Sequence, residues 1–340
     1  MRPDAWLLRR PAPLALARRL STHVRLPPML VATHNMMDGI HLGSLLRVYT
    51  ALAQRERPAF VGALCLQENH SGHAAQVAAA LGPPHRAHVS PGAPRLALVY
   101  DSARVSFQAE TVVQLPRLSV VPLWQRLYTS STPEQKVGVV YRLEVDAGAT
   151  GGPPRPLVVS NFHLDSAGTN AHRAQQLRAV HAAHRAEALA LGGPGAPAPG
   201  VLCGDTNCFS FHRPLAGRAL RRMLRPLQTD LGMRDVGAAS DWPTHYFARA
   251  DEPKVGQRIA VLFGTLGVDF PCRYDVVCTS LPVVSQGQEH VAGSDHDLVW
   301  AAVRVDGGWP PGGDAEGGWP SGGHTEGTEQ GAGGAKASAE

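Results

Sequence analysis

The most constraining feature of this sequence is a series of short apolar runs that recurs between residues 29 and 305. Runs of this length, bounded by polar residues, are typical of strands. The predicted strands cover Met29–Thr33, Phe60–Leu66, Arg95–Tyr100, Val105–Leu115, Gln135–Val145, Leu157–Phe162, Val201–Cys203, Arg273–Cys278 and Asp297–Val305. Helical spacing or alanine content predicts helices over Ser44–Gln54, Gly72–Leu81 and Thr169–Leu191. This alternation predicts an α/β or α+β sandwich, with two sheets face to face and helices outside.

Composition bounds the class of protein. The chain has 340 residues, of which 44% are hydrophobic, and this is enough to build a large core. Its 5 cysteines form no Cys-x-x-Cys pair, so we expect an intracellular, reducing environment and neither a disulfide framework nor a zinc site. No apolar run approaches the roughly 18 residues of a membrane span. A net charge of +4 permits a phosphate-bearing substrate without requiring one.

Both ends of the chain differ from the middle. Residues 1–28 are rich in arginine and contain a single acid, Asp4, as in mitochondrial or plastid transit peptides. A basic, disordered extension from a GC-rich genome explains the same composition equally well. Residues 306–340 are mostly Gly, Pro, Ser, Glu and Thr, which cannot bury a core and predict a disordered tail. The predicted folded domain is therefore residues 29–305.

Polar side chains follow or precede five of the predicted strands. They are Asn35, Glu68, His163, Asp205 with Asn207, and Ser294-Asp295-His296. Each has a structural explanation when taken alone: Glu68 suits the positive end of a helix, and His163 suits a hydrogen-bonded core position. All five together, each beside a strand, favour a common site.

The segment Gly204-Asp205-Thr206-Asn207 follows the apolar run Val201–Cys203 directly. An isolated match would be an ordinary turn, since Gly, Asp and Asn are turn formers. In an extended segment, however, residues two apart point to the same side. Asp205 and Asn207 would then pair a general base with an amide that holds a substrate oxygen.

A known family shares these motifs. They are Thr33-His34-Asn35, Leu66-Gln67-Glu68, Asn161-Phe162-His163-Leu164, Gly204-Asp205-Thr206-Asn207, Arg273-Tyr274-Asp275-Val276-Val277 and Ser294-Asp295-His296. In these, from about Met29 to Val305, the chain resembles the endonuclease/exonuclease/phosphatase superfamily, also called the deoxyribonuclease I-like fold. The resemblance implies a four-layer α/β/β/α sandwich with two mixed sheets, and an active site at one end of the paired sheets.

The resemblance also implies a metal-dependent phosphoester hydrolase. Glu68 would be the main ligand of Mg²⁺ or Mn²⁺, because carboxylate oxygens suit such hard cations. Asn35 and Asp295 would assist at the metal, and Asn35 would also hold the phosphate. Asp205 would orient and deprotonate the attacking water, and Asn207 would donate to a phosphoryl oxygen.

Imidazoles and a loop complete the implied site. His296 would stabilise the developing charge on the phosphate, with its ring oriented by Asp295. His163 would be a second imidazole on the phosphate. Asp275 would hydrogen-bond within the site or to substrate, although a structural role is nearly as well supported. Trp242 and Tyr246 lie where such enzymes carry substrate-contacting loops, and they could equally anchor that loop.

The substrate is the open question. His163-Leu164-Asp165-Ser166, then Arg173 and Gln176, then Thr206, resemble the tyrosyl-DNA phosphodiesterase branch, so nucleic acid is the preferred partner. One alternative is a phosphomonoesterase on a small molecule such as an inositol phosphate. Another is a non-catalytic binding protein with the same fold. We expect a monomer.

An arginine cluster with helical spacing is a further candidate for contacts to nucleic-acid phosphates. Its members are Arg218, Arg221, Arg222 and Arg225. A solvated basic helix face is the more common outcome for such a cluster.

Overall fold

The computed structural model describes residues 26–70, 72–121, 123, 134–146, 153–192, 196–210, 213–238, 243–246, 266 and 272–305. Trp242, nearly all of residues 1–28 and all of 306–340 lie outside the described residues, so the predictions for them stay predictions. No described helix is both long and apolar enough to cross a membrane.

Twelve strands and five helices form the described part of the chain. The strands are β1 (Met29–Asn35), β2 (Phe60–Gln67), β3 (His85–Val89), β4 (Ala97–Asp101), β5 (Val105–Gln114), β6 (Val137–Val145), β7 (Arg155–His163), β8 (Gly200–Asp205), β9 (Arg234–Asp235), β10 (Asp275–Thr279), β11 (Val283–Glu289) and β12 (Leu298–Val303). The helices are the 3-10 turn η1 (Met37–Gly39), α1 (Leu42–Arg55), α2 (His73–Leu81), α3 (Asn170–Gly192) and α4 (Arg213–Leu231).

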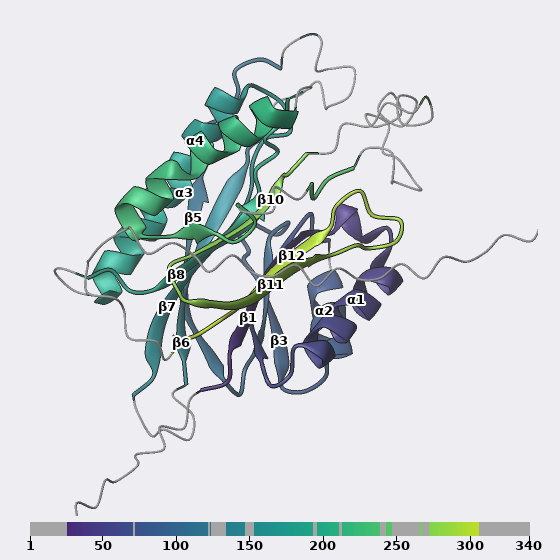
Figure 1. Cartoon of the computed structure of the whole chain (residues 1–340), viewed down its shortest axis with the longest axis vertical. Coiled ribbons are helices and arrows are strands. Elements are labelled where there is room, and N and C mark those ends of the chain that lie inside the picture. The colour runs from purple at the N-terminus through teal and green to yellow at the C-terminus, as the bar shows by residue number, and fades with distance from the viewer. Residues whose placement is uncertain are drawn as a thin grey trace, which may run out of the picture. The chain divides into compact units, whose positions relative to one another are not determined.

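The strands form two mixed six-stranded sheets, in the orders β11-β12-β1-β2-β4-β3 and β5-β6-β7-β8-β10-β9. In the first, β1 and β2 are parallel; in the second, β7 and β8 are parallel. Figure 1 shows α1 and α2 on one side of the sheets and α3 and α4 on the other. The four-layer α/β/β/α sandwich expected from the sequence is therefore confirmed.

Four apolar clusters of described residues hold the layers together, the smallest of them between α3 and the second sheet. The central cluster joins the facing sheets, with Met29 and Val31 of β1 packed in the same core as Tyr141 of β6 and Val201 of β8. A second lies between α1, α2 and the first sheet, and a third between α3, α4 and the second sheet. Strands β1 and β8 are buried along their whole length because both of their faces are covered, which explains why they read as continuous apolar runs.

All nine predicted strands and all three predicted helices are present, with shifted ends. The sequence analysis did not predict β3, β9 or β11 as strands. The burial pattern of β11 is half-exposed throughout, and β9 has only two residues, so neither produces an apolar run. The helical spacing of the α4 arginines is confirmed, although no helix was predicted from the sequence over the whole of α4.

Candidate active site

The polar strand ends come together at one end of the paired sheets. In the parallel pair β1–β2, Asn35 is the register partner of Gln67, directly before Glu68. In the parallel pair β7–β8, His163 is the partner of Asp205. On the other side of β8, Asp205 pairs with Asp275 of β10. Because parallel strands end at the same edge, the fold gathers these side chains without long loops.

Unusual backbone conformations mark the same edge. Among the described non-glycine residues, positive φ angles occur only at Met37, Asp38, Glu68 and Asn207. Each lies just beyond the carboxyl end of β1, β2 or β8. Such conformations cost free energy and concentrate at functional sites, where the surrounding structure imposes them.

Asp205 lies at the centre of the cluster and is almost fully buried. Its Oδ2 accepts a hydrogen bond from Nδ2 of Asn35 at 3.0 Å, and its Oδ1 accepts one from the backbone N–H of Asn207 at 2.7 Å. Two imidazole nitrogens face Oδ2: Nε2 of His163 at 3.6 Å and Nε2 of His296 at 3.9 Å. The carboxylate is therefore held from both sides and faces two imidazoles.

The turn after β8 explains its glycine and its asparagine. A Cβ on Gly204 would lie 2.2 Å from the carbonyl oxygen of Phe162, so only glycine allows β8 to approach β7 so closely. Asn207 adopts φ 47° and donates from Nδ2 to the carbonyl oxygen of Leu164 at 3.0 Å. One N–H of the Asn207 amide thus ties the turn to the end of β7, and the amide has a second N–H.

His296 is oriented by Asp275. Its Nδ1 lies 2.9 Å from Oδ2 of Asp275, and the hydroxyl of Thr244 donates to the same oxygen at 2.8 Å. Burial disfavours the imidazolium, but the negative charges of Asp275 and Asp295 outweigh it and raise the pKa of His296 to about 10. Asp295 was predicted to orient this ring, whereas the residue that lies at its Nδ1 is Asp275.

His163 has the opposite electrostatic surroundings. Burial, reinforced by the positive charge of Lys136, holds the pKa of His163 well below its ordinary value. Its Nε2 lies 4.0 Å from Oε1 of Glu68, and the other oxygen of Glu68 lies 4.0 Å from Nη2 of Arg95. The site therefore contains one charged and one neutral imidazole on either side of Asp205.

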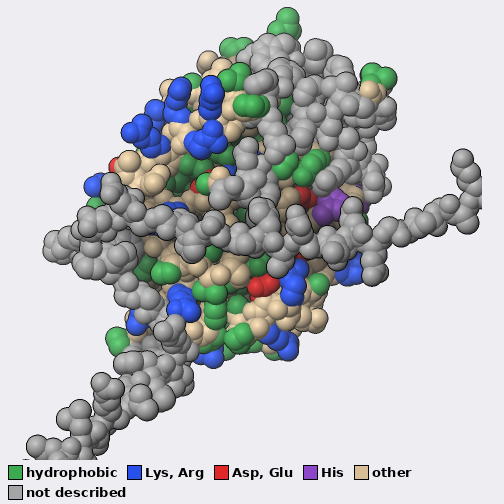
Figure 2. Space-filling model, in the orientation of Figure 1, with side chains coloured by type: hydrophobic (Ala, Val, Ile, Leu, Met, Phe, Trp, Pro, Cys, Tyr) green, Lys and Arg blue, Asp and Glu red, His purple; other side chains and the backbone are tan. Residues whose placement is uncertain are grey.

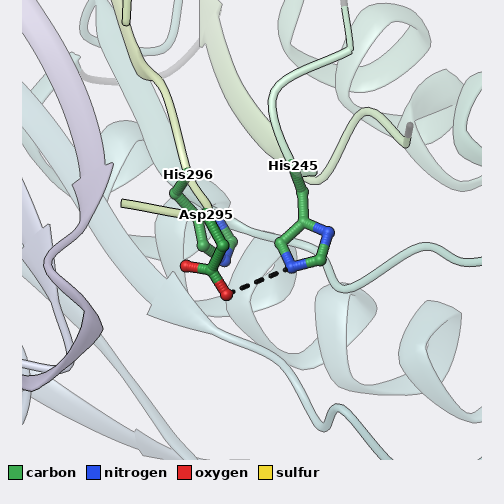
Figure 3. Close-up of side chains that lie close together, drawn as sticks. All are labelled: His245, Asp295 and His296. Atoms are coloured by element: carbon green, nitrogen blue, oxygen red, sulfur yellow. Dashed lines mark ion pairs between the residues drawn. The ribbon is translucent and has the colours of Figure 1, made fainter. Parts of the chain in front are cut away.

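Asp295 lies beside a third imidazole, that of His245. Figure 3 shows Asp295 and His296, adjacent in the chain, facing His245 from a separate segment. Nε2 of His245 lies 3.5 Å from Oδ2 of Asp295. The His245 ring stacks on Tyr274 with centroids 4.4 Å apart and meets the His296 ring edge-on at 4.7 Å.

Two groups of side chains have the spacing of a cation site. One is His245, Asp295 and His296, and the other is Asp205, Asp275 and His296; in each, the ligand atoms lie within 4.8 Å of one another. Oδ1 of Asp275 is buried and has no hydrogen-bond partner among the described residues. A buried, unsatisfied carboxylate oxygen among further carboxylates fits a positively charged ligand.

Two residues of the site, Thr244 and His245, were not predicted from the sequence to belong to it. Thr244 also accepts from the backbone N–H of Tyr274 and Asp275 through Oγ1, and so fixes the start of β10. His245 precedes Tyr246 in the loop predicted to contact substrate, but it had no predicted role of its own. Tyr246, predicted to contact substrate, donates its hydroxyl to the carbonyl oxygen of Pro243 at 3.0 Å. A threonine and a histidine in a loop have no periodicity that would reveal them.

Side-chain contacts join the loop after β7 to α3, and the residues that make them, Asp165, Arg173 and Gln176, are hereafter the latch. The Asp165 carboxylate accepts from Nε2 of Gln176 at 2.7 Å and lies 2.9 Å from Nε2 of His172. Arg173 donates from Nε to the Asp165 carbonyl oxygen at 2.7 Å and from Nη2 to that of Ser166 at 2.7 Å. These contacts fix the loop after β7 onto α3, and so fix the position of His163.

Comparisons with known proteins agree with the fold. No protein-family model matches the chain, and no curated protein matches it by sequence. Among solved structures, the human Nocturnin catalytic domain with bound sulfate superposes with a TM-score of 0.53 at 14% identity, covering 82% of this chain and 95% of that one. An endonuclease/exonuclease/phosphatase from Bacteroides vulgatus gives 0.52 at 13% identity, covering 81% and 98%. A humanized D. rerio TDP2 gives 0.50 at 12% identity, covering 82% and 100%.

Proposed function

We propose that this chain, which has the fold of the endonuclease/exonuclease/phosphatase proteins, is a divalent-metal-dependent phosphoester hydrolase of the phosphodiesterase type. The observation that carries the proposal is the environment of Asp205. A buried carboxylate is fixed by Asn35 and by the Asn207 backbone, and it faces one charged and one neutral imidazole. A structural carboxylate would gain little from two imidazoles beyond hydrogen-bond distance, whereas a reacting water and a phosphate need groups placed in this way.

Asp205 is the proposed general base. Water adds to phosphorus, its proton passes to the Asp205 carboxylate, and the bond to the leaving oxygen breaks. Asn35 donates to Oδ2 and accepts from the Met37 backbone N–H at 3.0 Å, so both ends of its amide are engaged and Asp205 is held in one orientation. Asn35 therefore acts in this proposal first as a positioning residue, and its role at a metal or phosphate stays a prediction.

His296 and His163 are the proposed phosphate contacts. With a pKa of about 10, His296 is an imidazolium at neutral pH and can donate a charged hydrogen bond to a non-bridging oxygen. Nδ1 of His296 is hydrogen-bonded to Asp275, which leaves Nε2 of His296 to face the site. His163, with a lowered pKa, is neutral and donates or accepts through Nε2 according to its tautomer. The second N–H of Asn207 is a further donor.

The donor set suits a hard divalent cation such as Mg²⁺ or Mn²⁺. Glu68 is the proposed main ligand, since its side chain is only 15% exposed and one of its carboxylate oxygens lies 4.0 Å from Nε2 of His163 at the site edge. Asp295 is proposed to assist. When bound, the cation would neutralise phosphate charge and support the leaving oxygen. Oδ1 of Asp275 is buried without a hydrogen-bond partner among the described residues, and this favours a bound positive charge near the carboxylates of the site.

Nucleic acid is the proposed substrate class, with 5′-tyrosyl-DNA as the specific candidate. The support is the resemblance of Asp165, Arg173 and Gln176, and of Thr206 within the Gly-Asp-x-Asn motif, to the tyrosyl-DNA phosphodiesterase branch. Thr206 donates through Oγ1 to the Tyr274 carbonyl oxygen at 2.8 Å, so it joins the turn after β8 to β10.

A substrate panel tests the proposal. Labelled DNA, RNA, 5′-tyrosyl-DNA and inositol phosphates are incubated with the full chain, in Mg²⁺ and in EDTA. We expect metal-dependent cleavage of a phosphodiester, with 5′-tyrosyl-DNA among the best substrates. Turnover confined to inositol phosphates would replace the proposal with a phosphomonoesterase, and no turnover of any member would contradict an enzymatic function.

The proposed transit peptide is tested separately. Residues 1–28 fused to a fluorescent reporter should direct it to an organelle, and a diffuse cytosolic signal would contradict this prediction.

A further inference from the structure

Within the predicted folded domain, residues 29–305, the net positive charge is concentrated in one helical layer. Helix α4 contains five arginines and one aspartate, and α3 contains three arginines and one glutamate. These two helices thus carry six positive charges in excess, more than the net +4 of the whole chain. The remainder of the chain is net acidic. On the opposite side of the sheets, α2 has no charged residue other than histidine, and α1 has two arginines.

The α4 arginines form a single exposed row. Arg218, Arg221, Arg222 and Arg225 are all exposed, at positions that share one face of a helix. The opposite face of α4, including Leu220, Leu224 and Leu227, is buried against the second sheet. Figure 2 shows Lys and Arg side chains gathered over the region of α4, in the upper left of that view. The row therefore faces solvent because the helix is amphipathic and fixed by its apolar side.

This row also lacks the partners that other arginines have. Arg55 donates to Glu289 through two nitrogens, Arg142 pairs with Glu187, and Arg273 pairs with Asp235. None of the four α4 arginines makes a hydrogen bond or ion pair within the described part of the chain. The one acid of α4, Asp230, lies 3.6 Å from His181 of α3. The four guanidinium groups repel one another, and an external anion would relieve that repulsion.

The row begins at the end of the sheets that carries the candidate active site. Strands β7 and β8 end there at His163 and Asp205, and α4 begins at Arg213, eight residues after β8 ends. Strands β8 and β9 both pair antiparallel with β10 and are therefore parallel to each other, so α4, which connects them, runs back along the second sheet and carries the arginines away from that end. Between Arg218 and Arg225 the helix rises roughly 10 Å, about three phosphate steps along one duplex strand.

We propose that the exposed row Arg218, Arg221, Arg222 and Arg225, hereafter the α4 row, binds the phosphate backbone of a nucleic-acid strand extending from the active site. Guanidinium groups suit this partner because they bind phosphate oxygens in pairs and keep their charge at all physiological pH values. The choice of partner rests on the proposed function. The surface would supply affinity and orientation without reading sequence, as backbone contacts do.

Two matched triple variants test the proposal. One replaces Arg218, Arg221 and Arg225 with Gln. The control replaces three exposed arginines outside α3 and α4, Arg47, Arg57 and Arg86, with Gln. Both remove the same net charge, and Gln keeps a similar helix propensity in α4. Binding of a fluorescein-labelled oligothymidylate is measured by anisotropy in EDTA over a range of salt concentrations.

The α4 triple should bind the oligonucleotide about tenfold or more weakly at low salt, and its log–log salt slope should fall by about 2. The control triple should change affinity less than about threefold, by net charge alone. Metal-dependent hydrolysis of bis(p-nitrophenyl) phosphate should be the same in both triples and the wild type. Equal losses of binding in the two triples, or an unchanged slope in the α4 triple, would overturn the proposal.

The surface and the catalytic proposal fail in different ways. A wild-type protein that hydrolyses the small diester but binds no oligonucleotide would contradict the α4 row and leave the chemistry standing. Oligonucleotide binding through the α4 row without any hydrolysis would contradict the chemistry alone. Flotation with phosphatidylserine vesicles provides a second arm of the experiment. If the α4 triple loses vesicle binding but keeps its oligonucleotide binding, the α4 row binds a membrane surface and the proposal is overturned.

Discussion

Two buried polar clusters lie between the sheets, and they differ in how their hydrogen bonds are satisfied. The first is the amide network, which consists of Thr33, Gln67 and Asn161. In it, Gln67 donates from Nε2 to Oδ1 of Asn161 at 2.7 Å. Asn161 donates from Nδ2 to two backbone carbonyl oxygens of the opposite sheet, those of Leu66 and Ala97, each at 3.0 Å. The second is the acid–imidazole cluster of Asp205, Asp275, His163 and His296. It contains charged groups at longer distances and an unsatisfied oxygen on Asp275.

The difference separates stability from chemistry. A matched, neutral amide network joins the sheets at little electrostatic cost, whereas buried carboxylates close to one another destabilise the fold unless a ligand compensates. Both clusters draw on one short motif, in which Asn161 lies two residues before His163, and Gln67 likewise directly precedes Glu68, the proposed metal ligand. Within one motif, therefore, one residue holds the sheets together and its neighbour faces the site.

Replacing Asp205 with Asn should produce the largest effect on the acid–imidazole cluster. We expect turnover of a phosphodiester to fall about 10²–10⁴-fold, because the general base is lost while the shape is kept. The melting temperature should stay equal or rise, since one of several neighbouring buried carboxylates becomes neutral. Calorimetric unfolding and steady-state kinetics on the same preparation check both parts. Turnover within a few-fold of wild type would contradict the role of Asp205.

Asp275→Asn should act on the same cluster through His296. The folded-state pKa of about 10 keeps His296 charged to high pH, so activity that needs the imidazolium is lost as pH rises through that value. Removing the Asp275 charge lowers this pKa, and the alkaline loss of kcat should begin at least about one pH unit lower. A pH–rate profile measures the shift, and Asp165→Asn in the latch is the control that should leave the alkaline limb in place.

Asn161→Ala should disrupt the amide network and so lower the stability of the fold, and it should have little effect on the catalytic rate. It leaves the Gln67 amide and two carbonyl oxygens without their buried partner, which we expect to cost about 2–4 kcal/mol of unfolding free energy. Urea denaturation measures this loss. Per folded molecule at low temperature, turnover should stay within a few-fold of wild type, and a loss as deep as that of Asp205→Asn would show that the two clusters are not separable.

The smallest effect, measured between pH 7.0 and 5.5, concerns two buried histidines outside both clusters. Burial lowers the pKa of His34 and of His184 to about 3, from 6.5. Between these values the unfolded chain binds protons that the folded chain does not, so stability is present above pH 6.5 and is lost as pH falls toward 3. For each of the two histidines, the free energy of unfolding should fall by up to about 1.4 kcal/mol per pH unit in this window.

Urea unfolding at pH 7.0 and 5.5 measures that slope, in a range where few carboxylates titrate. His184→Gln should reduce it. A stability that is unchanged between the two pH values would contradict the assignment of both histidines as buried neutral groups.

The sequence allowed the fold to be predicted further than the site. Continuous apolar runs such as Val201–Cys203 identify strands covered on both faces, and the polar residues after them predicted which edge is functional. Partners inside the site could not be predicted in the same way. Asp275 and Asp295 both lie near His296, and the register of β10 decides which one reaches its Nδ1.

Thr244 and His245 illustrate the remaining limit. They lie in a short described segment, 243–246, that pairs with Cys272 and His296 through isolated bridges. Nothing in the local sequence distinguishes a threonine that donates to a carboxylate of the candidate site from one that faces solvent. The same holds for the latch, where Asp165 and Gln176 meet only because α3 folds back on β7.

The most direct test of the metal-assisted chemistry is the Mg²⁺ dependence of phosphodiester turnover, measured for the wild type and for Glu68→Gln. The account predicts saturable activation of the wild type, no turnover in EDTA, and a loss of activation in the variant without a loss of folding. Equal turnover in EDTA and in Mg²⁺, or a variant whose Mg²⁺ dependence matches the wild type, would contradict it.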